Sequence, residues 1–313
     1  MFLLHWTRRS GIALTALAVG LFLAAGVPRA QQSRRAPAHG LGLIRPKQSD
    51  YARYPALKMS LRDAGALPDR FTLEDFLPPI GNQGKTGSCV GWSTAYYCYS
   101  MAVAKERRLT SDQRQDSRFL FSPGWIWDQY NGGDPEKGMQ IFQAFEVLEK
   151  MGCAPLAEYP WKDTAQTWKP TEAAKKKAEF YKARRTLVMF RGARAGDPAD
   201  PEKMRHWLYE AKLPIVIGIP IYEDFPRGSV PDSYVYSRGP SESPLQGYHA
   251  ICILGYDKSK QAFMMVNSWG EAWGSRGKMW LSEKFIVENA IQGCVQTPGG
   301  PRLRGYQIVP PSN

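Results

Sequence analysis

The pattern of apolar residues changes midway along the chain, and this change limits the folds available to it. In the first part, apolar residues recur at helical spacing near 139–151, and a charged helix is expected near 171–183. The second part has one expected helix near 201–212. It also contains runs typical of strands, at Thr186–Phe190, Pro214–Ile221, Tyr248–Leu254, Ala262–Asn267 and Lys278–Leu281. The sequence therefore predicts an α+β fold, with a helical half over about 82–183 and a mostly antiparallel β half over about 184–313.

A Pro-free run from Val90 to about Arg108 predicts a largely buried helix that begins at Cys89. A helix N-terminus places partial positive charge beside the sulfur, which lowers the pKa of a thiol and favours the nucleophilic thiolate. Gln83 lies six residues before Cys89, in a loop. Its side-chain amide and the backbone N–H of Cys89 could together stabilise a developing oxyanion.

Two further motifs lie far downstream, Gly247-Tyr248-His249-Ala250 and Val266-Asn267-Ser268-Trp269-Gly270. A thiol, an imidazole and an amide in this chain order are the parts of a cysteine nucleophile, its base and the group that orients the base. Each residue alone has a structural explanation, as a buried thiol, a core histidine or a turn asparagine. Together they predict acyl-transfer chemistry, and neither a metal site nor a cofactor is expected.

These motifs resemble the active-site region of papain-like cysteine peptidases over roughly residues 67–290. The Gln-to-Cys spacing matches, and the block Asn267–Gly270 followed by Trp273-Gly274 is the most specific feature. The resemblance implies a papain-like two-subdomain fold, with a helical half, an antiparallel β-barrel-like half and the active site in the cleft between them. Thr86 stands where the family usually has a disulfide-forming cysteine. The chain therefore resembles a bacterial-type member without that disulfide.

The resemblance implies a peptidase that hydrolyses peptide bonds through an acyl-enzyme on Cys89. In that mechanism His249 is the general base and acid, Asn267 orients the imidazole, and Gln83 helps to bind the oxyanion. A polypeptide substrate is expected, with a protein inhibitor as a second possible partner. Two alternatives stay open: a transpeptidase or transamidase that uses the same acyl-enzyme, and a catalytically degenerate peptide-binding module.

Three residues are candidates for contact with the substrate. The resemblance aligns Gly138-Met139 with a Gly-Gly pair that hydrogen-bonds the substrate backbone, and Asn131-Gly132-Gly133 is a competing alignment. A core role for Met139 is an equal alternative. Trp269 is expected to cover the His–Asn pair and to line the leaving-group side.

Residues 1–30 are typical of an export signal, because Arg8 and Arg9 precede an uncharged apolar run of 16 residues. We therefore expect a periplasmic or secreted protein. No stable membrane span is expected, since a span needs about 20 residues, although an uncleaved anchor is an alternative. Residues 31–66 are interpreted as a linker or short pro-segment and 67–313 as the peptidase domain. Little self-inhibition by a folded propeptide is expected, because the segment is too short for a folded inhibitory domain, but Tyr51–Leu67 could lie across the cleft as an extended strap.

The net charge of +12 favours acidic surfaces, but no nucleic-acid-binding motif accompanies it, so no nucleic-acid partner is expected. A monomer is expected. The five cysteines are Cys89, Cys98, Cys153, Cys252 and Cys294. An odd number leaves at least one free thiol, and Cys89 fits that role. Cys98 and Cys252 are expected to be small buried residues, and the sequence does not pair the remaining cysteines.

Overall fold

The computed structural model describes residues 39–61, 64–237, 243–297 and 306–309. All of these belong to one compact unit, 37–313. The export signal expected over 1–30 lies outside the described residues. Within the described ranges, no helix combines the length and the apolar character that a membrane span requires.

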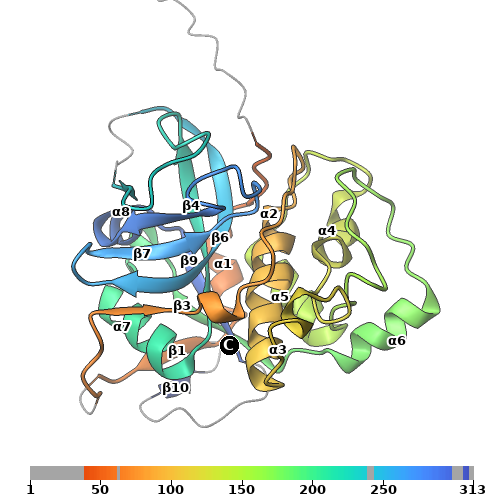
Figure 1. The fold of residues 1–313 in the computed structure, drawn as a ribbon, viewed down its shortest axis with the longest axis horizontal. Coiled ribbons are helices and arrows are strands. Elements are labelled where there is room, and N and C mark those ends of the chain that lie inside the picture. Colours follow the sequence, from red (N-terminus) through yellow and green to blue (C-terminus); the bar gives the residue numbers. More distant parts are fainter. Residues whose placement is uncertain (1–38, 62–63, 238–242, 298–305, 310–313) are drawn as a thin grey trace, which may run out of the picture. The chain divides into compact units, whose positions relative to one another are not determined.

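The helices carry most of the first half of the described chain (Figure 1). The α-helices are α1 Gln48–Tyr51, α2 Cys89–Gly91, α3 Ser100–Glu106, α4 Pro123–Asn131, α5 Ile141–Lys150, α6 Glu172–Phe180, α7 Pro201–His206 and α8 Glu283–Asn289. Wider π-helical turns follow two of them, at Trp92–Tyr99 after α2 and at Trp207–Ala211 after α7. Short 3-10 turns occupy Glu74–Phe76, Gln113–Gln115 and Ala193–Ala195.

The described strands form one mixed sheet. They are β1 Ala56–Met59, β2 Arg70–Thr72, β3 Arg185–Phe190, β4 Ile215–Tyr222, β5 Val235–Tyr236, β6 Leu245–Asp257, β7 Ala262–Val266, β8 Lys278–Ser282, β9 Gln292–Thr297 and β10 Tyr306–Val309. Their order is β10-β1-β3-β9-β4-β6-β7-β8-β5, with β2 paired to β6 outside this path. Most pairs are antiparallel, and β1–β3 and β5–β8 are parallel. The path has two ends, so the described sheet is not closed.

A single helical segment from α2 to α3 connects the two halves. Its residues from Cys89 to Ala104 are buried. The hydroxyl groups of Ser93 and Thr94 donate to the carbonyl oxygen of Val90, at 3.2 and 2.6 Å. Such side-chain bonds compete with the regular helical hydrogen bonds, which fits the widened turns that begin at Trp92.

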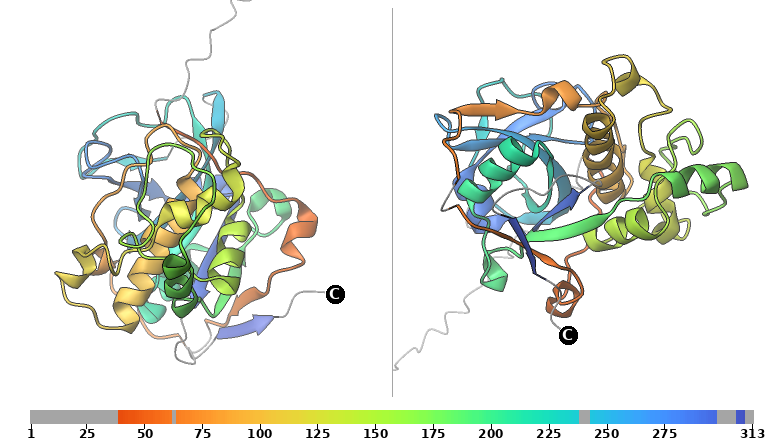
Figure 2. Two further views of the ribbon diagram at one scale, coloured as in Figure 1. Left: turned by 90° about the vertical axis from the view of Figure 1, so that its right-hand side faces the viewer. Right: turned by 90° about the horizontal axis from the view of Figure 1, so that it is seen from below.

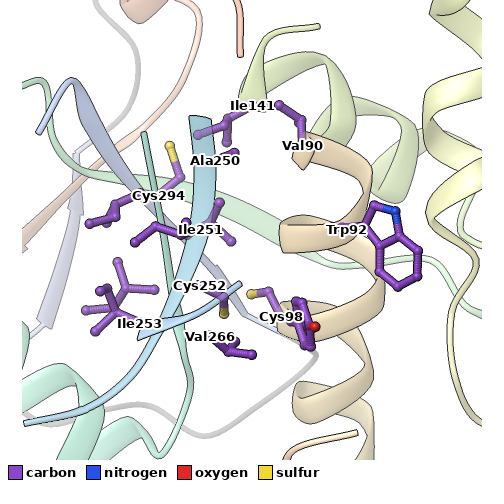
Figure 3. Close-up of a cluster of buried hydrophobic side chains, with 14 of the residues drawn as sticks. Val90, Trp92, Cys98, Ile141, Ala250, Ile251, Cys252, Ile253, Val266 and Cys294 are labelled. Atoms are coloured by element: carbon purple, nitrogen blue, oxygen red, sulfur yellow. The ribbon is translucent and has the colours of Figure 1, made fainter. Parts of the chain in front are cut away.

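This segment packs directly against the middle of the sheet. Cys98 projects from it toward Cys252 on β6 (Figure 3). On the other side of the segment lie α4, α5 and α6, as Figure 2 also shows. The segment therefore has buried contacts on both sides, and its first residue, Cys89, lies at the boundary between the helices and the sheet.

Part of the segment 31–66, interpreted as a linker or short pro-segment, has regular structure. Its residues form α1 and β1, and β1 pairs with β3 and β10. Tyr51 and Leu57 are buried in the core. Sequence reasoning missed this because β1 is only four residues long and gains its stability from pairing with distant strands.

Candidate active site

Cys89 is the first residue of α2 and is completely buried. Its N-cap residue, Ser88, makes no side-chain capping bond, so the first N–H groups of the helix stay free to face the site. Burial raises the pKa of the Cys89 thiol to about 11, although backbone hydrogen bonds from Ala250 and Gly42 oppose the rise. The backbone groups of Cys89 and Val90 at the helix start lower this pKa as expected, but desolvation of the thiolate is the larger effect.

His249 and Asn267 come together through the register of β6 and β7. Cys252 pairs with Val266 in this register, so one further step places Asn267 opposite Ile251. Residues two apart on a strand share a face, so His249 and Asn267 are diagonal neighbours on one side of the sheet. The His249 Nε2 and Asn267 Oδ1 atoms are 2.8 Å apart.

The hydrogen bonds around Asn267 determine the tautomer of His249. Asn267 Oδ1 also accepts from the backbone N–H of Ser268 at 2.8 Å, which identifies it as the oxygen of the amide. An oxygen can only accept, so His249 Nε2 carries a proton. In the neutral ring the other nitrogen, Nδ1, is then a bare acceptor, and it has no hydrogen-bond partner among the described residues.

Aromatic side chains enclose the imidazole. The Trp269 ring lies 4.7 Å from the His249 ring, between centroids, and Trp273 packs edge-on against Trp269. Burial lowers the pKa of His249 to about 4, while the Asn267 hydrogen bond opposes this and nearby His39 adds to it. Burial therefore shifts both Cys89 and His249 against ionisation.

Gln83 reaches the same place from the loop before α2. Its Oε1 accepts from the hydroxyl of Ser268 at 2.6 Å, and its Nε2 donates to the carbonyl oxygen of Thr86 at 2.7 Å. The second proton of Nε2 points to the carbonyl oxygen of Gly40, 3.1 Å away. A fixed amide that donates to a backbone carbonyl oxygen is the geometry that an oxyanion donor requires.

The carbonyl oxygen at Gln83 belongs to an extended segment, His39–Pro46, which we call the strap. Gly40 N–H donates to Gly84 O, and Leu43 N–H donates to Tyr248 O, each at 3.2 Å. Gly42 lies against the Cys89 thiol. The His39 ring stacks on Trp269 at 4.6 Å. The strap therefore covers Cys89, Gln83 and the wall around His249 together.

Gly138-Met139 lies alongside the strap and pairs with it. Met139 N–H donates to Gly42 O at 2.9 Å, and Ile44 N–H donates to Met139 O at 3.0 Å, a parallel β-bridge centred on Leu43. A Cβ on Gly138 would overlap the backbone of Gly42. The backbone of Gly138-Met139 thus pairs with an extended chain, while the Met139 side chain is fully buried.

The glycines of the competing alignment, Gly132 and Gly133, lie at the C-terminal end of α4. Gly132 is the left-handed cap that ends α4, and the space around Gly133 is open. Both have positive φ angles, at which a residue with a side chain is strained. A helix-ending turn explains them fully.

Part of 31–66, the strap, lies across the candidate site, whereas the occluding segment that the sequence left open was Tyr51–Leu67. No separately folded inhibitory domain is needed for this. An extended segment forms its backbone hydrogen bonds with the rest of the protein. Even a short segment can therefore be held in place without folding by itself.

Two positioning residues were missed by sequence reasoning. Tyr97 donates its hydroxyl proton to Asn267 O at 2.9 Å and accepts from the N–H of Gly81 at 3.0 Å, so it joins the central helix to both site loops. Ser268 fixes Gln83, as described. In the sequence, Tyr97 resembles any other apolar position of the helix. Its role is visible only from its hydrogen bonds to Asn267 and Gly81.

The structure describes no group of three or more His, Cys, Asp or Glu residues that could hold a metal ion. All five cysteines are free and buried.

Comparisons with known proteins agree with this arrangement. The family model described as papain family cysteine protease matches residues 68–297. An uncharacterized peptidase C1-like protein of Acanthamoeba polyphaga mimivirus is 26% identical over 233 residues, 70% of this chain and 69% of the relative. Ananain of Ananas comosus is 25% identical over 272 residues, 82% of this chain and 68% of ananain.

Solved structures show the same fold. Xylellain, a cysteine protease from Xylella fastidiosa, superposes with a TM-score of 0.67 at 22% identity, covering 85% of this chain and 99% of xylellain. Digestive procathepsin L2 of Tenebrio molitor gives a TM-score of 0.63 at 19% identity, with 83% and 78% covered. The family match spans well over half of the chain, and the α+β fold is that of papain-like proteases. The chain therefore belongs to the papain family of cysteine proteases.

Proposed function

We propose that this hydrolase cleaves peptide bonds with Cys89 as its nucleophile. The observation that carries the proposal is the asymmetry of His249. Its Nε2 is held by Asn267, while its Nδ1 has no hydrogen-bond partner among the described residues, and the backbone of the next residue, Ala250, hydrogen-bonds the Cys89 thiol. A base that is oriented on one side and free on the other is what activation of a thiol requires.

In the proposed reaction, His249 Nδ1 takes the thiol proton and the Cys89 sulfur bonds to the scissile carbonyl carbon. The oxyanion accepts from the Gln83 amide and the Cys89 N–H. The imidazolium then gives its proton to the leaving amine, and the C–N bond breaks. Water, activated by His249, hydrolyses the thioester and restores the thiol.

Gly138, Met139 and Trp269 are proposed to bind the substrate. The support is that the strap, itself an extended polypeptide, already pairs with the backbone of Met139 and packs on Trp269. Export to the periplasm or beyond is part of the proposal and rests on residues 1–30. The segment boundaries 1–30, 31–66 and 67–313 are also part of the proposal. Residues 39–61 of the middle segment are structured.

The test compares Cys89→Ala with Cys98→Ala, both in a chain that begins at residue 47 and lacks the strap. Peptide hydrolysis should vanish in Cys89→Ala and persist in Cys98→Ala, since both remove one buried sulfur but only Cys89 faces the site. Circular dichroism checks that both variants fold. Hydrolysis by folded Cys89→Ala at the parent rate would refute the mechanism.

A further inference from the structure

A cationic pocket of about 270 Å³ lies beside the strap. The strap and α1 contribute Arg45 and Tyr51 to its wall, and the loop after β3 contributes Arg191 and Arg194. Cys89, Gln83 and His249 do not line it. The pocket is therefore a different place from the proposed catalytic site, joined to it by the strap.

The three guanidinium groups have no carboxylate partner among the described residues. Among the ion pairs between described residues, none involves Arg45, Arg191 or Arg194, and Glu288 is the one acidic side chain in the described lining. Three positive charges thus face one negative charge. Arg45 and Arg194 are exposed and Arg191 is partly buried, so water solvates these groups, and the excess of positive charge favours an anion in the pocket.

Other acidic groups nearby are engaged elsewhere. Asp50 on α1 pairs with Arg53 at 3.6 Å and accepts from the Gln140 amide at 3.1 Å. Asp197 accepts from the backbone N–H of Arg191 at 3.1 Å. Neither carboxylate lines the pocket.

Aromatic rings hold two of the guanidinium groups in place. Arg45 lies over the Tyr248 ring at 5.3 Å, and Arg191 lies over the Tyr51 ring at 5.9 Å. The Tyr51 hydroxyl donates to the carbonyl oxygens of Arg191 and Ile291, which ties α1 to the loop after β3. Stacked guanidinium groups lose less freedom when they bind a ligand, and their forks match phosphate and carboxylate oxygens.

We propose that this pocket binds a phosphate- or carboxylate-bearing small anion through Arg45, Arg191 and Arg194, and that the bound anion keeps the strap closed. Arg45 belongs to the strap, whereas Arg191 and Arg194 belong to the body of the enzyme. When the strap leaves, the anion loses one of its three arginines. It therefore binds the closed state more tightly and shifts the population toward that state.

The binding half of the proposal does not depend on the proposed function and is tested on the full chain carrying Cys89→Ala. Inorganic pyrophosphate and citrate are titrated separately by calorimetry at constant ionic strength. Arg191→Gln with Arg194→Gln should weaken binding by about tenfold or more, because charge-assisted hydrogen bonds are the strong ones. The matched control, Lys176→Gln with Lys177→Gln, removes two exposed charges from α6 and should leave affinity unchanged.

Comparison of the two ligands shows whether the pocket prefers a phosphate or a carboxylate. Tighter binding of pyrophosphate assigns the pocket to phosphates, and tighter binding of citrate assigns it to carboxylates; either result supports the site. Absence of saturable binding, or equal losses in the arginine and lysine variants, overturns it. Melting temperatures without ligand show that the variants are folded.

The coupling half is measured by hydrogen exchange of residues 39–46 in the same Cys89→Ala chain. Exchange should slow when pyrophosphate or citrate saturates the protein, and Arg45→Gln should abolish this slowing while the other two arginines still bind. Unchanged exchange at saturation would refute the closing effect. In the active chain, the better ligand should lower the rate of peptide hydrolysis, and this last readout alone depends on the proposed function.

Discussion

At the residue scale, the position of the Gln83 amide depends on Ser268. Ser268 donates to Gln83 Oε1, and this leaves Nε2 directed at a backbone carbonyl oxygen in the site. The serine follows Asn267, which holds His249. Two neighbouring residues of one loop therefore orient the proposed base and the proposed oxyanion donor.

Gln83→Ala in the chain that begins at residue 47 should lower kcat by roughly 10²–10³, the usual effect of removing one oxyanion donor. Ser268→Ala should lower kcat less, because the amide stays present but loses its orientation. The double variant should be no slower than Gln83→Ala, since Ser268 is expected to act only through Gln83. Steady-state kinetics of all three variants decide this, and additive losses would give Ser268 a separate role.

At the element scale, the strap is held by close backbone contact. A Cβ on Gly42 would overlap the carbonyl group of Gly87, whereas a Cβ on Gly65 meets no atom. Gly42→Val should therefore displace the strap and raise kcat/KM toward a peptide, and Gly65→Val should not. The rise is about tenfold or more if the closed state is favoured by about 1.4 kcal/mol or more. Equal rates in both variants and the parent would show that the strap does not block the site.

The position of a truncation should separate release of the strap from damage to the sheet. A chain that begins at residue 47 keeps α1 and β1, whereas one that begins at 67 loses both, including buried Tyr51 and Leu57. We expect the first to be active and stable and the second to melt at a lower temperature, because lost core side chains cost about 2–5 kcal/mol each. Thermal unfolding followed by circular dichroism measures the difference. Equal melting temperatures would mean that β1 adds nothing to the stability of the sheet.

Elements with a repeating apolar pattern were predictable from the sequence. The helix that begins at Cys89, α5 and strands β3, β4, β6, β7 and β8 lie where periodicity placed them. β9 was missed because its buried residues include Gln292 and Gln296, which look like surface positions in a sequence. The strap was missed because two glycines alternate with its leucines and its stability comes from backbone bonds to distant segments.

The residues that meet at the candidate site were predictable from their motifs, but their electrostatic state was not. A helix N-terminus is visible in a sequence, whereas complete burial under a strap is not. Burial reverses the expected direction of the Cys89 pKa and shifts that of His249 in the opposite sense. Both shifts disfavour the charged forms that the proposed reaction needs.

At the scale of the whole molecule, the buried imidazole makes stability depend on pH. His249 has a pKa of about 4 in the folded protein, against about 6.5 when it is exposed to water. Between these values the unfolded chain binds more protons than the folded one, so the free energy of unfolding falls as the pH falls. Above about pH 6.5 both states are neutral at this residue, and its contribution no longer changes.

We therefore expect His249 to remove about 2–3 kcal/mol of stability between pH 7 and pH 4.5. Carboxyl groups titrate in the same range, so the useful quantity is a difference between two proteins. Urea unfolding of the Cys89→Ala chain is compared with that of Cys89→Ala combined with His249→Gln, at both pH values. The gap between their free energies should shrink or reverse on acidification, because only the first protein has an imidazole to protonate on unfolding. A gap that stays constant across the two pH values would show that the buried histidine titrates normally in the folded state.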